Sequence, residues 1–114
     1  MAFSEVQLAA IDATVGELCR RKSPAHLAAE LRLDYTVERH TVTIIERRAP
    51  WRGGENWTAQ GCARFKYAAR EKRWKLYWMR RDMKWHAYQL DRPMRSLAAL
   101  VEEVEADEYG AFFG

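Results

Sequence analysis

The segment from Arg64 to Tyr88 alternates aromatic or apolar side chains with cations, and this pattern constrains the fold more than any other part of the sequence. Alternate residues of a β-strand point to opposite faces of a sheet, so the pattern predicts strands with one apolar and one basic face. Between Arg64 and Lys84 there are nine cations and two acids, a local charge of +7 in a chain whose net charge is +3. The basic residues are therefore gathered on one part of the fold.

The first two strands of this segment are expected to form a hairpin whose loop has an even number of residues. The odd positions are apolar from Arg64 to Arg70, whereas the even positions are apolar from Arg73 to Met79. A loop of two residues, Glu71 and Lys72, or of four residues then puts both apolar sets on one face. The predicted cross-strand pairs are Ala69 with Trp74, Tyr67 with Leu76 and Phe65 with Trp78. The opposite face gathers Arg64, Lys66, Arg70, Arg73, Lys75 and Tyr77.

The next hairpin has two alternatives that the sequence leaves open. A two-residue turn at residues 82–83 places Trp85 on the apolar face and leaves His86 and Tyr88 among the cations. A three-residue turn at residues 81–83 reverses this assignment, so that His86 and Tyr88 are buried and Trp85 joins the basic face. In both cases at least one aromatic ring lies beside the cations.

Apolar residues at helical spacing flank the strands at both ends of the chain. Ser4 begins a predicted amphipathic helix that extends to about Arg21, and Ser96 is the expected N-cap of a second helix. An alternating run at residues 31–37 and a run rich in β-branched residues at 42–48 predict a further hairpin between the two helices. The order helix, about five antiparallel strands, helix predicts an α+β fold with a meandering sheet. The C-terminal helix and its end carry Glu102, Glu103, Glu105, Asp107 and Glu108, opposite in charge to the sheet.

Length and composition narrow the class of protein. We expect one domain over residues 1–114, because two smaller pieces would each bury too little surface to be stable. The N-terminus lacks the pattern of a signal peptide and no apolar run approaches about 18 residues, so a cytoplasmic protein without a membrane segment is expected. Two cysteines and three histidines are scattered singly along the chain. This spacing predicts neither a disulfide framework nor a metal or cofactor site.

Two segments of the chain carry specific motifs. Residues 74–88 read WKLYWMRRDMKWHAY, and residues 108–114 read EYGAFFG. They resemble the W..YWMR.D.KWH.Y hairpin and the YG.FFG ending of a family of small bacterial proteins, domain of unknown function 3024. Residues 46–51 (ERRAPW) are similar to the family's E.R.P.W element, and the resemblance covers about residues 30–114. It implies the same order of elements and a docked C-terminus, and it implies no activity.

The basic face favours a non-catalytic binding module. Single-stranded nucleic acid or another polyanion is the preferred ligand, because cations would contact phosphates and rings would stack on unpaired bases. The candidate binding residues are Arg64, Lys66, Arg73, Lys75, Tyr77, Arg81, Lys84 and Tyr88. A protein partner or a second copy of the chain is an alternative, since Trp, Tyr and Arg are enriched at interfaces. A solvated face whose rings pack on Lys and Arg stems is another.

An enzyme is the contrasting class. Its candidate residues are Glu46, Arg48, Asp82, Lys84 and His86, provided that the two hairpins bring them together. Glu46 lies among apolar residues, where a carboxylate needs a cationic partner. A structural ion pair between Glu46 and an arginine is therefore the competing interpretation.

Overall fold

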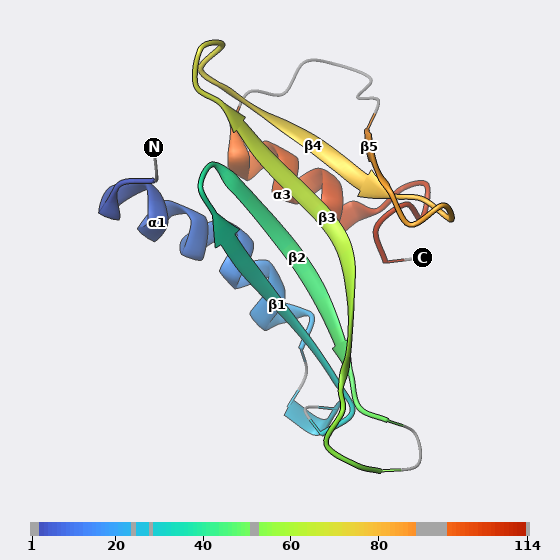
Figure 1. Cartoon of the computed structure of the whole chain (residues 1–114). Coiled ribbons are helices and arrows are strands. Elements are labelled where there is room, and N and C mark those ends of the chain that lie inside the picture. Colours follow the sequence, from blue (N-terminus) through green and yellow to red (C-terminus); the bar gives the residue numbers. More distant parts are fainter. Residues whose placement is uncertain (1–2, 24, 28, 51–52, 89–95, 114) are drawn as a thin grey trace.

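The computed structural model describes residues 3–23, 25–27, 29–50, 53–88 and 96–113. Its elements are α1 (Glu5–Ile11), a π-helical segment (Asp12–Gly16), α2 (Glu17–Arg21), a 3-10 turn (Ala25–Leu27), β1 (Leu31–Glu38), β2 (Thr41–Arg48), β3 (Thr58–Ala68), β4 (Arg73–Met79), β5 (Trp85–Ala87) and α3 (Leu97–Ala106). The strands form one antiparallel sheet in the order β1-β2-β3-β4-β5 (Figure 1). The predicted α+β meander is confirmed.

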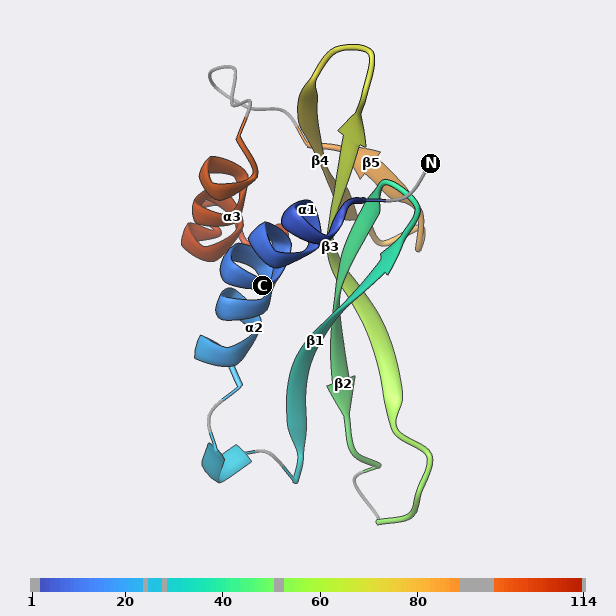
Figure 2. The same cartoon turned by 90° about the vertical axis from the view of Figure 1, so that its left-hand side faces the viewer.

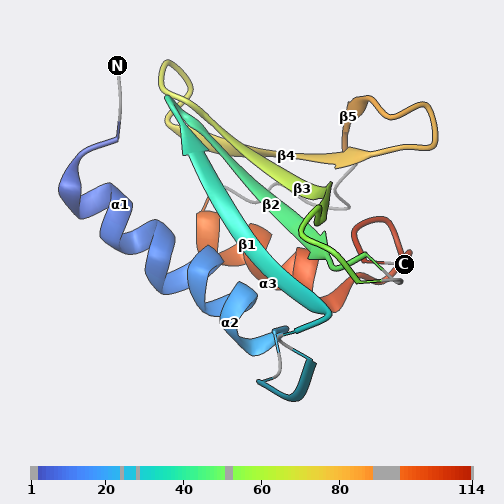
Figure 3. The same ribbon diagram turned by 60° about the horizontal axis from the view of Figure 1, so that its bottom comes forward.

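The helices of the described residues cover one face of this sheet and leave the other open. In Figure 2, α1, α2 and α3 all lie on the left of the strands, and in Figure 3 they lie below them. The sequence predicted both helices but not the face on which they pack. Their arrangement gives the molecule a helix-covered face and an open face. None of the described helices is long and apolar enough to cross a membrane.

The core lies between the helices and the covered face of the sheet. Aliphatic residues and one phenylalanine of the central strands meet the apolar stripes of the helices. The largest fully buried side chains are Phe65, Ile11, Leu18, Ile44, Leu100, Val15, Val42 and Val104. Trp74 and Trp78 are half-buried and pack against the edge of this core. The tryptophans therefore border the core, and smaller residues fill its centre.

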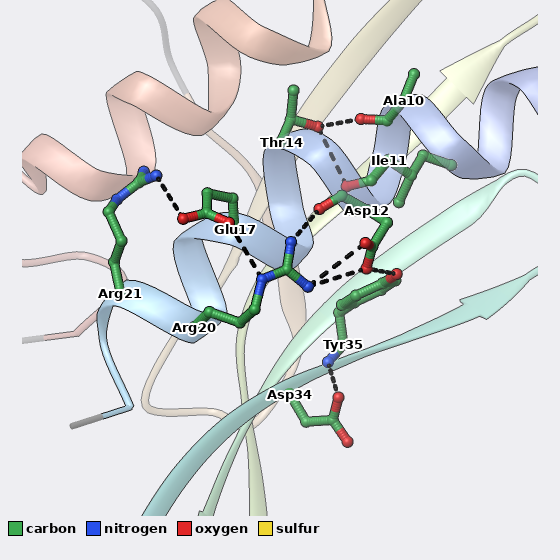
Figure 4. A network of polar contacts seen from close by, with 9 residues as sticks. All are labelled: Ala10, Ile11, Asp12, Thr14, Glu17, Arg20, Arg21, Asp34 and Tyr35. Atoms are coloured by element: carbon green, nitrogen blue, oxygen red, sulfur yellow. Dashed lines mark hydrogen bonds and ion pairs between the residues drawn. The ribbon is translucent and has the colours of Figure 1, made fainter. Parts of the chain in front are cut away.

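The N-terminal helix begins as predicted and then departs from regular α-helix. Ser4 and Gln7 form a capping box, whereas residues 12–16 form a π-helical turn. In Figure 4 the Asp12 carboxylate accepts hydrogen bonds from the Tyr35 hydroxyl (2.8 Å) and from Arg20 (3.3 Å). A Cβ on Gly16 would lie 2.5 Å from Asp12 Oδ1. Glycine at this position lets the helix approach β1 closely enough for the carboxylate to reach the strand.

The C-terminal segment docks on the fold, as the resemblance implied. Asp107, which ends α3 in the left-handed conformation, accepts hydrogen bonds from the backbone N–H groups of Phe112 (3.0 Å) and Phe113 (2.9 Å). Phe112 is buried against Tyr88, with ring centroids 4.9 Å apart. Lys22 lies over the Phe113 ring at 4.8 Å. These contacts hold the last described residues against α2 and β5.

The hairpin between β3 and β4 has the predicted faces but different partners. Phe65 lies opposite Leu76, Tyr67 opposite Trp74 and Ala63 opposite Trp78. Each predicted pair is therefore wrong by two positions, although Phe65, Tyr67, Trp74, Leu76 and Trp78 share the helix-covered face. Ala69 and Arg70, predicted on the apolar and basic faces, lie exposed in the link between the strands. The strands are joined by four residues, 69–72, and Lys72 adopts a positive φ of 50°. A shift of two residues keeps every side chain on its own face, so alternation does not distinguish the two registers.

The hairpin between β4 and β5 follows the three-residue alternative. Arg80 donates its N–H to the carbonyl of Lys84 (3.2 Å), and Met83 has the positive φ that such a turn needs. His86 lies opposite Trp78, and Trp85 lies opposite Met79. His86 is therefore on the helix-covered side of the sheet, and Trp85 is on the open side.

Candidate functional site

The open face of the sheet carries a cluster of cations and rings, which we call the basic face. Its cations are Arg64 and Lys66 on β3, Arg73 and Lys75 on β4, and Arg39 from the β1–β2 turn; its rings are Tyr77 and Trp85. The alternation of β3 and β4 turns these side chains away from the helices. The sheet therefore presents a basic surface that no described helix covers.

Two lysines face each other at the centre of the basic face. Lys66 and Lys75 are direct cross-strand partners, and like charges in this position destabilise a sheet. Glu71 offsets part of this repulsion, because it pairs with Lys75 (2.9 Å) and with Arg73 (3.4 Å). The hydrogen bond from Lys75 is the largest cause of the lowered pKa of Glu71. Lys66 has a different neighbour, the Tyr77 ring, whose centroid lies 5.9 Å from its Nζ.

A bulge in β3 shapes one end of the basic face. Ile44 pairs with Ala63 and Ile45 with Gly61, so Cys62 is the extra residue of the bulge. The Cys62 side chain is buried, and this burial raises the pKa of its thiol to about 11. Gly61 faces the open side, where Trp85 lies against it. The bulge therefore places a residue without a side chain beneath an aromatic ring.

Trp85 contacts a cation with its ring and the strand with its benzo edge. The Arg64 guanidinium lies 4.4 Å from the Trp85 ring centroid and donates a hydrogen bond to the Thr43 hydroxyl (3.1 Å). These residues border a depression of about 560 Å³ that is also lined by Arg39, Lys66, Thr41, Ile45 and Met79. A second depression of about 470 Å³ is lined by Lys75 and Tyr77 and shares Arg39, Thr41 and Lys66 with the first. The basic face is thus hollowed at two adjoining places.

The predicted binding residues fall into three groups. Arg64, Lys66, Arg73, Lys75 and Tyr77 lie together on the basic face, as predicted. Arg81 and Lys84 are exposed in the β4–β5 turn, beyond the paired strands. The placement of Tyr88 on the basic face was wrong, because the three-residue turn puts it on the helix-covered side against Phe112.

The predicted list lacked three residues that belong to this surface. Trp85 appeared only in one of the two turn alternatives, and the sequence contains no signal that chooses between them. Arg39 lies in a turn, where alternation assigns no face. Gly61 lies beside a bulge, which shifts the parity of β3. Sequence periodicity did not place these three residues, because their positions depend on turn geometry and on an irregularity in a strand.

The structure does not bring the enzyme candidates together. Glu46 pairs with Arg48, and its side chain is 20% exposed; His86 Nε2 pairs with Asp82 Oδ2 at 2.8 Å. Cross-strand neighbours form one row from β2 to β5 that consists of Ile44, Ala63, Trp78 and His86. Ile44 and His86 are thus three strand spacings apart, which is roughly 14 Å. Glu46 lies two residues beyond Ile44 along β2, so its ion pair is remote from the histidine. Within the described ranges, no three His, Cys, Asp or Glu side chains gather as a metal site would need.

One comparison with known proteins finds a match that covers most of the chain. A family model described as "Domain of unknown function (DUF3024)" matches residues 3–114. This range includes both motifs, the sheet and the helices at either end. No curated protein and no solved structure matches the chain. The family assignment therefore rests on the match to this model, and the site must be interpreted from its own geometry.

Proposed function

The chain belongs to the DUF3024 family, a domain of unknown function, and from this premise we propose that it is a non-catalytic module whose basic face binds single-stranded nucleic acid. One observation carries the proposal: the described helices α1, α2 and α3 pack on the other face of the sheet. Had either terminal helix crossed Lys66, Lys75 and Tyr77, no surface would remain for a ligand. The open face instead keeps its cations and rings available.

The charge arrangement supports a polyanionic ligand. Lys66 and Lys75 are held opposite each other although the folded chain alone gains nothing from the contact. A bound phosphate between them would replace repulsion with two attractive contacts, and it would release the counterions that it carried. Arg39 borders both hollows and Arg64 borders the first, so a chain of phosphates can meet several cations in succession.

The rings support a single strand over a duplex. Tyr77 and Trp85 are half-exposed among the cations, and an aromatic ring can stack only on a base that is not already enclosed in a helix. Tyr77 pairs with Ala87, and Trp85 lies two residues away along β5, so the two rings are diagonal neighbours on adjacent strands. Neighbouring rings of this kind suit successive unpaired bases.

Fluorescence anisotropy with a labelled oligonucleotide tests the proposal. We expect micromolar affinity for single strands, weaker binding to a duplex of the same length, and a log-log salt slope of about −0.7 for each phosphate contacted. The variant Lys66→Glu/Lys75→Glu should weaken binding to every sequence and flatten the slope by about 1.4, because two phosphate contacts are lost.

A matched control reverses two cations on the helix-covered side. Lys22 and Arg80 each lie over one ring, Phe113 and Trp78, so Lys22→Glu/Arg80→Glu changes the net charge by the same amount at a different place. This control should bind nearly as well as the parent chain. Absence of binding at low salt, or an equal loss in both double variants, would refute the proposal and favour a protein partner for the basic face.

A further inference from the structure

We infer that the depression beside Trp85 is a subsite for one nucleotide unit, with the base against the indole and the phosphate on Arg39, Arg64 and Lys66. The inference rests on the proposed function and makes that function specific. It assigns recognition of a base to one residue and recognition of charge to others. It concerns Trp85, which the sequence alone could not assign to this face.

The position of Trp85 depends on the absence of a side chain beneath it. A Cβ built on Gly61 would lie 2.6 Å from Trp85 Cζ2 and 2.9 Å from Cη2, closer than real Cβ contacts allow. The same point is 3.5 Å from the terminal methyl of Met79. The benzo edge of the indole therefore rests directly against the strand, where only glycine leaves room for it. A ring seated in this way loses little further freedom when a ligand binds.

The guanidinium of Arg64 links the ring to the charged part of the depression. It lies over the indole at 4.4 Å and is oriented by its hydrogen bond to Thr43. A planar guanidinium held in one orientation can stack on a ring and still offer N–H groups to a phosphate. Arg64 is thus preorganised at the boundary where a base would meet its own phosphate.

The lining of the depression divides by chemistry in the way that a nucleotide does. Trp85, Met79 and Gly61 form an apolar group, and Arg39, Arg64 and Lys66 supply cations. The hydroxyls of Thr36, Thr41 and Thr43 also line it, and Glu38 is the acid among the lining residues. A volume of about 560 Å³ lies within the ordinary range for small-molecule sites. A ligand with a flat ring, hydroxyl or carbonyl groups and a phosphate matches this set.

Abasic oligonucleotides separate recognition of the base from recognition of charge. An eight-residue thymidine strand and an eight-residue abasic strand carry the same phosphates, and only the first offers rings. We expect the thymidine strand to bind at least about tenfold more tightly, the gain that one stacked base provides. The variant Trp85→Leu should lower affinity for the thymidine strand by about tenfold and change affinity for the abasic strand by less than about twofold.

The variants are chosen so that folding does not confuse the result. Leucine can fill the space against Gly61 and Met79 without offering a flat ring, and Trp85→Phe, which keeps a ring, should retain most of the preference for bases. Tyr109→Ala removes a ring that is 68% exposed outside the basic face, and it should leave both affinities unchanged.

The outcomes distinguish this inference from the function on which it rests. Equal binding of the two strands, or a Trp85→Leu variant that keeps the full preference, would overturn the nucleotide subsite and leave a basic face that binds phosphates alone. Failure of both strands to bind at low salt would instead refute the proposed function, and the subsite with it.

Discussion

On the helix-covered face of the sheet, Val42, Ile44 and Phe65 have no exposed surface, whereas Thr43 and Lys66, their neighbours in the same strands, line an open depression. The first set makes the contacts with the helices that stabilise the fold. The second set contributes little to the core, and its Lys66 faces Lys75 in a repulsive cross-strand pair. This difference indicates that folding depends on one face and that the other is available for a ligand.

The largest expected difference between the two faces is in the loss of stability when one ring is removed from each. Phe65→Ala empties a site with 0% exposure and should cost about 3 to 5 kcal/mol of the free energy of unfolding, enough to unfold much of a marginally stable chain. Tyr77→Ala on the basic face should cost much less, because its ring is only half-buried. Urea denaturation followed by circular dichroism measures both. Equal losses would mean that the basic face is also part of the core.

A smaller effect of opposite sign is expected from the lysine pair. Lys66→Glu replaces a cross-strand repulsion with an attraction to Lys75, so the melting temperature should rise by a few degrees while oligonucleotide binding falls. Lys72→Glu, in the turn between β3 and β4, is the control, since its side chain has no cross-strand partner in the paired register. A lower melting temperature for Lys66→Glu would show that the repulsion is not felt in the folded protein.

The smallest effect concerns an ion pair on the helix side. Arg21 donates two hydrogen bonds to Glu105 (2.9 and 3.0 Å) and joins α2 to α3, and this contact lowers the pKa of Glu105 below its ordinary value of 4.5. A lowered folded pKa gives stability above about pH 4.5 that is lost as the pH falls through the folded pKa.

Thermal melts between pH 6 and pH 3 test this contribution. Glu105→Gln should reduce the melting temperature slightly at pH 6 and make its fall toward pH 3 shallower than in the parent chain. Glu102→Gln, an exposed change on the same helix, should leave the slope of the parent nearly intact. Identical slopes for Glu105→Gln and the parent would mean that the pair adds no pH-dependent stability.

Periodicity predicted which residues of the β3–β4 hairpin share a face, and it failed where the chain departs from regular strand. The exact partners of Phe65 and Tyr67 depended on a four-residue turn, and the side of Trp85 depended on a positive φ at Met83. The enzyme candidates illustrate the same limit at longer range. Glu46 and His86 were plausible neighbours in sequence terms, but two intervening strands separate their elements in the sheet.

By itself, the sequence determined the order of elements, the capped start of the first helix and the division of β3 and β4 into an apolar and a basic side, because these features depend on residues close together in the chain. Only the tertiary structure decided that both terminal helices pack on the apolar side, that a bulge at Cys62 seats Trp85 on Gly61, and that Arg39 joins the cations. These outcomes depend on burial between distant segments and on turn geometry, and a local pattern of side chains contains neither.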